Sequence, residues 1–544
     1  MGFAATWMRD FDGPEAAGSG VVLRFHQFYR ERSARAPGLL MLALAIPLFT
    51  GCALDSERID GAAPALAEKF REGAARPASA LAQDWFQAFG SSELTSLARQ
   101  ALEGNLDLAA ALARYAQADA QMRIAESALY PQLSGSGDAS RSLSPGTARS
   151  KTPPFTSSVG NRFDAGLSAS YVLDFWGRNQ SLAEASRLGL AASRFDYDTA
   201  AVAMLASLAN TYFQVLVAQD RLQIARENIR AAENVLGAIR GRIEVGTATA
   251  LDLAQQETVI ANLRVNIPIL ERQMLQQKNL VAVLVGRTPE SMTIKGGRLR
   301  SLALPSVRPG LPSQLLFRRP DIAGSEARLA AAEARIVAAR AAFLPNITLT
   351  GSGGLSSIAL RNLLRADAVA LSAAASVTQP IFDGYNLQGQ LDAARGSRNE
   401  LLADYRRSIV TALSDVENAL IAVRKYAEQE RAQAIAVDTA RRAYQITQQR
   451  LREGIIDVVT LLNTQTTLFS AQDALTLVRY QRLLAIVSLY QALGGGFTRE
   501  YSDPMIYEGR ATPAPMDSSI TSSMTSSTPA PSAAPPATAV QERP

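Results

Sequence analysis

The sequence contains almost no histidine or cysteine. Its 544 residues include one histidine, His26, and one cysteine, Cys52. Triads built on Ser-His-Asp or Cys-His and ordinary zinc sites all need an imidazole, and His26 lies upstream of a predicted processing site at Cys52. A single cysteine also excludes an internal disulfide. Because no pair of carboxylates in the sequence suggests a glycosidase, we predict that the chain is no enzyme and binds no metal or cofactor.

Aromatic residues and net charge are also scarce. The chain is 47% hydrophobic but only 6% aromatic, so alanine and leucine supply most of the apolar share. This composition suits long helices better than a thick globular core. The 55 basic and 50 acidic residues leave a net charge of +5, and no dense basic cluster with interleaved aromatic residues occurs. The sequence therefore predicts no binding of nucleic acid.

The first residues resemble a bacterial lipoprotein signal. Several arginines precede an uncharged stretch, 36–53, whose apolar centre is too short to span a bilayer. Two small residues then precede Cys52, as in a lipobox, where the cysteine is acylated and becomes the mature N-terminus. We predict a signal peptide with an N-terminal extension at 1–51 and a lipidated N-terminal segment at 52–89. The alternative is a signal peptide cut elsewhere, with an unmodified cysteine.

The rest of the chain is internally duplicated. Gly177 and Gly384 match at an offset of 384 − 177 = 207 residues, and Gly246 and Gly454 match at 454 − 246 = 208. A fixed long offset between matching landmarks indicates two copies of one structural unit. The predicted segments are a first repeat at 90–290, a Pro-rich linker at 291–317, a second repeat at 318–497 and a disordered Ser/Thr/Pro/Ala tail at 502–544.

Within each repeat the apolar pattern changes from a helical period to a period of two. Alternation of this kind predicts strands with one apolar face, and about ten residues allow a tilted strand to cross a bilayer. We predict hairpins at about 132–174 and 346–381. An all-α bundle would require four such runs to fall at repeat-related positions by coincidence. The side chains predicted to face lipid are Leu167, Tyr171, Leu349, Leu371 and Val377.

A very long helix is predicted after each hairpin. The segment 182–245 contains no proline and would extend roughly 95 Å at about 1.5 Å per residue. Its apolar residues follow alternating spacings of three and four, as in a coiled coil, and the second repeat has the same pattern. The seam has polar interruptions at Gln219 and Glu430. Each long helix is expected to turn back at a glycine, Gly246 or Gly454, into another helix.

Duplicated units of two strands and long helices resemble the TolC-like outer-membrane efflux proteins, over about residues 80–497. Further motifs are similar to the NodT-type lipoprotein branch, which serves resistance-nodulation-division pumps. These motifs are Asp174-Phe175-Trp176-Gly177-Arg178, Arg318-Arg319-Pro320-Asp321-Ile322, Glu326-Ala327-Arg328-Leu329, Phe343-Leu344-Pro345-Asn346-Ile347 and Leu489-Tyr490-Gln491-Ala492-Leu493-Gly494-Gly495-Gly496.

The resemblance implies an α+β membrane protein that forms a homotrimer. Each protomer would give four strands to one twelve-stranded β-barrel in the outer membrane, continued by an α-helical coiled-coil tunnel across the periplasm. Four strands are too few to close a barrel, whereas the twelve strands of three copies are enough, so the number of predicted strands agrees with a trimer. Such a duct conducts passively and is joined by a periplasmic adaptor to an inner-membrane pump. Two alternatives remain: a structural periplasmic coiled-coil lipoprotein and a type I secretion exit duct.

The resemblance also places the helix turns at the inner end of the tunnel. There Gly246, Thr247 and Gly454 would dock the adaptor, although any left-handed helix cap prefers glycine. Aspartates repeated threefold around a narrow axis would form charged rings that select cations or hold a gate closed. The gate candidates are Asp252, Asp457 and a counter-charge, Arg452.

Overall fold

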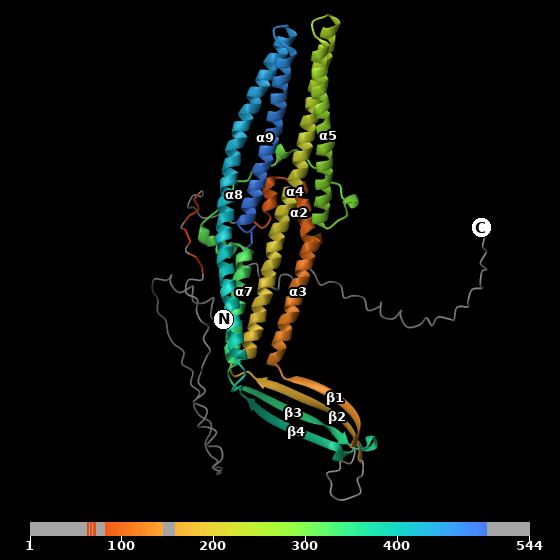
Figure 1. Ribbon diagram of the computed structural model, residues 1–544, viewed down its shortest axis with the longest axis vertical. Helices are drawn as coiled ribbons and strands as arrows, with labels where there is room; N and C mark the ends of the chain where they lie inside the picture. The colour runs from red at the N-terminus through yellow and green to blue at the C-terminus, as the bar shows by residue number, and fades with distance from the viewer. Residues whose placement is uncertain (1–62, 65, 68, 72–81, 145–157, 498–544) are drawn as a thin grey trace, which may run out of the picture. The chain divides into compact units, whose positions relative to one another are not determined.

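The computed structural model describes residues 63–64, 66–67, 69–71, 82–144 and 158–497 (Figure 1). All of them belong to one compact unit, 54–544. The predicted signal peptide, Cys52 and the predicted C-terminal tail lie outside the described residues. Within this unit, a β-sheet lies at one end of the long helices and two helical turns lie at the other end.

The sheet has four antiparallel strands in the order in which they occur along the chain. They are β1 (Gln132–Ser144), β2 (Ser158–Leu173), β3 (Asn346–Ser357) and β4 (Val369–Thr378). One hairpin comes from each repeat, and β2 pairs with β3 to join them. Each strand is long enough to cross a bilayer. The strands β1 and β4 remain as open edges, which a closed barrel would have to pair.

The register of the sheet assigns every side chain to a face. Leu167 lies opposite Gly353, which lies opposite Leu371, and the next row has Ser168 opposite Ser352. Because the strand period is two, the five side chains predicted to face lipid share one face, while serine and threonine dominate the other. The hydroxyls of one row also meet across strands, at 2.7 Å between the Oγ atoms of Ser134 and Ser168.

Two pairs of long helices follow the hairpins. The first pair is α4 (Arg178–Glu244) and α5 (Ala250–Val285), and the second pair is α8 (Asn386–Arg452) and α9 (Val458–Ala492). Both α4 and α8 have 67 residues, so each extends about 100 Å at about 1.5 Å per residue. The turns are therefore a full helix length away from the sheet.

The helix ends correct the predicted offset between the repeats. The residue before α4 is Gly177, and the residue before α8 is Tyr385 rather than Gly384, so the offset is 385 − 177 = 208 here too. Tyr385 has φ +67° and is the only non-glycine residue in the described ranges with a positive φ. A left-handed backbone costs a side-chain-bearing residue roughly 1–2 kcal/mol. Gly384 and Tyr385 both have φ +67°, and α8 begins after the tyrosine, so its glycine lies one residue further from the helix than Gly177 does in the first repeat.

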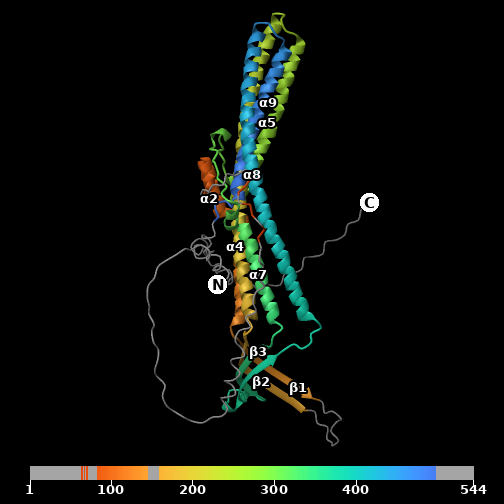
Figure 2. The same cartoon turned by 90° about the vertical axis from the view of Figure 1, so that its left-hand side faces the viewer.

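Shorter helices complete each repeat. The helices α3 (Leu106–Glu126), α4, α7 (Pro320–Ala341) and α8 pack side by side in that order. The helix α2 (Ser92–Gly104) lies on the flank of the long helices, between the sheet and the turns (Figure 2). The remaining short helices are η2 (Trp85–Phe89), η3 (Ser127–Leu129), η4 (Pro289–Ser291), η5 (Leu299–Ser301), η6 (Pro312–Gln314), α6 (Leu315–Arg318), η7 (Leu360–Asn362) and η8 (Ala366–Ala368).

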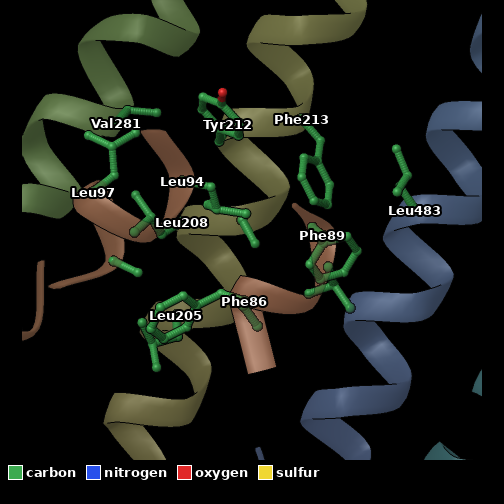
Figure 3. Close-up of a cluster of buried hydrophobic side chains, with 14 of the residues drawn as sticks. Phe86, Phe89, Leu94, Leu97, Leu205, Leu208, Tyr212, Phe213, Val281 and Leu483 are labelled. Atoms are coloured by element: carbon green, nitrogen blue, oxygen red, sulfur yellow. The ribbon is translucent and has the colours of Figure 1, made fainter. Parts of the chain in front are cut away.

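The largest buried cluster lies where η2 and α2 meet the long helices (Figure 3). Phe86 and Phe89 of η2 contact an apolar surface that includes Leu208 and Phe213 of α4 and Leu483 of α9. Each of these side chains is at least 98% buried, and full burial of a large apolar side chain contributes about 1.5–3 kcal/mol. By length and hydropathy, α4 passes as a membrane-spanning helix, but 61% of its most apolar window is buried inside the protein.

Candidate functional site

The two turns at the ends of the long helices have the same geometry. After α4, Gly246 has φ +75° and the backbone N–H of Thr247 donates to the carbonyl oxygen of Arg242 at 2.8 Å. After α8, Gly454 has φ +75° and the N–H of Ile455 donates to the equivalent arginine carbonyl at 2.9 Å. A Cβ atom at either glycine would meet nothing within 4 Å. Glycine is therefore favoured by the left-handed backbone and not by a lack of space.

Apolar side chains are exposed beside both turns. Val245 and Leu251 flank the first turn, and Ile455 flanks the second. Water covers these groups only at a free-energy cost, about 25 cal/mol per Å² of apolar surface. Together with the exposed glycines, they provide a surface that a partner protein can bury.

Both candidate aspartates form helix caps. The Oδ2 atom of Asp252 accepts from the backbone N–H of Thr249 at 2.8 Å, and the N–H of Asp252 donates to the Thr249 hydroxyl at 3.2 Å. Asp457 is the N-cap of α9, where its Oδ1 atom accepts from the N–H of Thr460 at 2.8 Å. These hydrogen bonds from Thr460 lower the pKa of Asp457 below its usual value. Both residues therefore have a local structural role, and Asp457 carries a full charge at neutral pH.

The structure does not bring Arg452 to Asp457. Within the part of the chain that it describes, the two residues form no ion pair. A different arginine, which the sequence analysis did not identify, connects the two turns. The Nη1 atom of Arg242 donates to the carbonyl oxygen of Leu451 at 2.9 Å, and its Nη2 atom donates to that of Thr247 at 3.3 Å. No local motif indicates this contact, because its partner lies 209 residues away.

The linker between the repeats is bound by side chains midway along the helices. The two carboxylate oxygens of Glu93, on α2, accept from the backbone N–H groups of Lys295 at 2.8 Å and Gly296 at 2.9 Å. The hydroxyl of Tyr212 on α4 also donates to Glu93, at 3.1 Å. Three donors on one carboxylate fix the linker against the first repeat.

Gln219, the first polar interruption in the coiled-coil seam, binds the same linker. Its side-chain amide donates to the carbonyl oxygen of Lys295 at 3.1 Å, and its Oε1 atom accepts from the N–H of Gly297 at 3.0 Å. The neighbouring Asp220 accepts from the N–H of Leu299 at 2.9 Å. Burial raises the pKa of Asp220 above its usual value.

Glu430, the second polar interruption, acts through arginines of α9. Its carboxylate accepts from Arg479 at 3.1 Å and from Arg482 at 2.7 Å. Arg479 also donates to the carbonyl oxygen of Arg300, at 3.0 Å. Gln219 therefore binds the linker directly, and Glu430 is connected to it through Arg479. The apolar periodicity alone does not indicate either role.

Three comparisons with known proteins agree with this architecture. The model of the family "outer membrane efflux protein" matches residues 97–287 and 311–495. OpmQ, a pyoverdine export outer membrane protein of Pseudomonas aeruginosa, is 38% identical over 417 residues, which cover 76% of this chain and 88% of OpmQ. TtgF, a toluene efflux pump outer membrane protein of Pseudomonas putida, is 32% identical over 477 residues, which cover 86% of this chain and 98% of TtgF. The open state of the Neisseria gonorrhoeae outer membrane channel MtrE superposes with a TM-score of 0.73 at 27% identity, covering 82% of this chain and 99% of MtrE.

Proposed function

The chain belongs to the outer membrane efflux protein family, and we propose that it is the exit duct of a tripartite efflux system that a resistance-nodulation-division pump drives. It is an outer-membrane channel that extends into the periplasm. In its fold, three copies contribute four strands each to one twelve-stranded barrel, and the long helices continue the barrel as a tunnel. A periplasmic adaptor would join this tunnel to the pump in the inner membrane.

The observation that carries the proposal is the four-stranded sheet with two open edges, joined to two helices of 67 residues. The test uses the full-length protein in planar lipid bilayers. We expect a trimeric mass, heat-modifiable migration on gels and discrete conductance steps. A structural coiled-coil lipoprotein would give no conductance and would contradict the proposal. A type I secretion duct would conduct, but its deletion would leave small-molecule efflux unchanged.

We also propose that the duct is passive and catalyses no reaction. The row Ser134, Ser168, Ser352 and Ser372 crosses all four strands on the polar face of the sheet. A lumen that presents this row of uncharged hydroxyl groups would hydrate many solutes there and select few of them; the charged residues of the same face, Asp138, Arg162 and Asp164, lie in other rows. OpmQ and TtgF are named for different cargoes, pyoverdine and toluene. These observations support a duct whose pump chooses the cargo.

The proposed adaptor-docking surface consists of the two turns. Gly246, Thr247 and Gly454 lie at the ends of the helices most distant from the sheet, and the exposed Val245 and Ile455 beside them add apolar area. Three protomers would present six such turns around one axis. This arrangement supports a partner with matching threefold or sixfold symmetry.

The proposed role of Asp457 in the gate leads to a measurable change in conductance. Replacing Asp457 with Ala removes three negative charges from the constriction and three helix caps. We expect higher single-channel conductance in planar bilayers, because the closed turn is less firmly held. The ratio of cation to anion permeability should move toward one, because a ring of like charge is lost. Unchanged conductance would remove Asp457 from the gate.

The matched control for this experiment is Asp457→Asn. Asparagine caps a helix about as well as aspartate but carries no charge. It should therefore change ion selectivity without opening the turn. Because the pKa of Asp457 is lowered, its charge and its cap are present at neutral pH. Both are lost only as pH falls through that lowered pKa, so cation preference should persist under mildly acidic conditions.

We further propose that Cys52 is the lipidated N-terminus of the mature chain and anchors it in the outer membrane. Mass spectrometry of the protein from membranes should find a diacylated Cys52 at the N-terminus. The variant Cys52→Ala should lose acyl anchoring, while the barrel still inserts and forms trimers. An unmodified cysteine, or cleavage at another residue, would refute this role.

A further inference from the structure

One charged residue lies among the apolar side chains on the face of the sheet that is predicted to meet lipid. This face contains Leu167, the residues of its row, and every second residue from there along each strand. Aliphatic residues, glycines and aromatic residues occupy nearly all of these positions. In the four described strands, the only charged residue on this face is Arg141 on β1, which is exposed. Asp138, Arg162 and Asp164 belong to the opposite face.

The position of Arg141 along the strands corresponds to the outer edge of the membrane. Arg141 lies opposite Asn161 of β2, and Tyr171 lies 171 − 161 = 10 residues closer to the helices on the same strand (Figure 1). Ten residues at about 3.3 Å each, tilted by about 40°, span roughly 25 Å, which is the height of the apolar band of an outer-membrane barrel. With Tyr171 in the aromatic girdle at the periplasmic interface, Arg141 lies at the depth of the outer headgroups.

Apolar side chains lie on both sides of Arg141 along the strands. Toward the bilayer centre, Ala139 pairs with Phe163. Toward the outside, Leu143 pairs with Val159, and these two residues are 66% and 53% exposed. A phospholipid headgroup would leave this outer pair in water, at a cost in free energy. A glycolipid carries sugars beyond its phosphates, and the C–H faces of sugar rings cover apolar groups. An arginine between two apolar rows therefore fits a phosphorylated glycolipid better than a phospholipid.

The charge of Arg141 is not neutralised within the part of the chain that the structure describes. No carboxylate in that part forms an ion pair with Arg141. The loop from β3 to β4, at the same end of the sheet, adds the exposed Arg361 and Arg365 and one carboxylate, Asp367. Arg365 and Asp367 are 3.6 Å apart and both are largely exposed, so their ion pair is weak. Three arginines and one aspartate give this end of the sheet a positive charge that complements an anionic surface.

We propose that Arg141 binds a phosphate group of a phosphorylated glycolipid in the outer leaflet of the outer membrane. A planar guanidinium donates two parallel hydrogen bonds to phosphate oxygens, and such charge-assisted pairs are strong and geometrically specific. The side-chain amide of Asn161, directly opposite on β2, supplies a further donor. The proposal rests on the proposed function, because a membrane-inserted barrel is what presents this face to lipid. The contact fixes the depth at which the barrel lies in the membrane.

Native mass spectrometry of the full-length protein tests the contact. The trimer in detergent is titrated with phosphorylated lipid A, and the bound lipid is counted. Arg141→Gln should weaken binding about tenfold, the loss expected for a charge-assisted hydrogen bond. The matched control is Arg162→Gln, because Arg162 is also exposed near the outer end of the sheet but lies on the opposite face and pairs with Asp164. This control should bind lipid A as the wild type does.

Two other lipids identify the chemical group that is bound. Lipid A without its phosphates should bind the wild type as weakly as lipid A binds Arg141→Gln. Phosphatidylglycerol, a phospholipid with one negative charge, should also bind more weakly than lipid A. Undiminished binding of the dephosphorylated lipid would exclude a phosphate site, and equally tight binding of phosphatidylglycerol would exclude a preference for glycolipid.

The variants decide whether Arg141 forms the site. Equal binding by the wild type and Arg141→Gln, or an equal loss in Arg162→Gln, would overturn the inference. If Arg141→Gln disturbs folding, Arg141→Lys provides a second measurement, since lysine keeps the charge but cannot form the paired hydrogen bonds. Its affinity should be lower than that of the wild type, and an unchanged affinity would contradict the site. A wild-type protein without trimers and conductance steps would instead refute the proposed function.

Discussion

Gly454→Arg is expected to abolish efflux while trimers still form and reach the outer membrane. Gly454 has φ +75°, lies at the end of a 67-residue helix and has open space where a side chain would go. A long charged side chain there, repeated threefold, would hold the adaptor away from the turn. Efflux is measured as the accumulation of a fluorescent substrate in cells, and assembly as the heat-modifiable trimer.

The matched control for this variant is Gly454→Asn. Asparagine tolerates the left-handed backbone better than other residues with side chains, and it is small. It should keep most of the efflux. If both variants lose efflux equally, the backbone of the turn matters and steric access does not. Full efflux in Gly454→Arg would mean that the adaptor binds elsewhere.

Leu167→Arg should prevent stable insertion of the barrel, whereas Ser168→Arg should be tolerated. The two residues are neighbours on β2 and lie on opposite faces of the sheet. Arginine on the lipid face at mid-bilayer costs roughly 2–4 kcal/mol, and three copies would multiply this cost in the trimer. An arginine on the lumen face remains hydrated. Urea unfolding of the protein folded into lipid vesicles measures the difference.

Equal destabilisation by the two arginines would contradict the predicted assignment of the Leu167 face to lipid and the Ser168 face to the lumen. Tolerance of Leu167→Arg with damage from Ser168→Arg would place the lumen on the other face. Leu371→Arg and Ser372→Arg form an independent pair on β4, because Leu371 lies in the same row as Leu167. The same order of effects should appear there.

The sequence predicts the strands and turns because each depends on a local pattern. Alternation over about ten residues identifies a strand face, and a glycine after a long apolar repeat identifies a left-handed helix end. The repeat offset predicted from the matching glycines is wrong by one residue at Tyr385. Because Gly384 and Tyr385 both have φ +67°, only the start of α8 shows that the tyrosine occupies the position equivalent to Gly177.

Contacts between distant residues were not predictable from these patterns. Glu93 accepts hydrogen bonds from a linker more than 200 residues away, and Arg242 donates to the end of the second long helix. In the sequence, both are ordinary charged residues on amphipathic helices. Gln219 and Glu430 were identified as interruptions of an apolar seam, but periodicity shows only that a position departs from the pattern and not what it binds.

The equal lengths of α4 and α8 restrict how the protein can change in evolution. Deleting one residue from α8 alone would lower its turn by about 1.5 Å and rotate everything beyond the deletion by about 100°. The contact of Arg242 with Leu451 would then be lost. A deletion of seven residues in all four long helices would preserve every face and shorten the tunnel by about 10.5 Å. Relatives that bridge a narrower or wider periplasm are therefore expected to differ in length by matched heptads in both repeats.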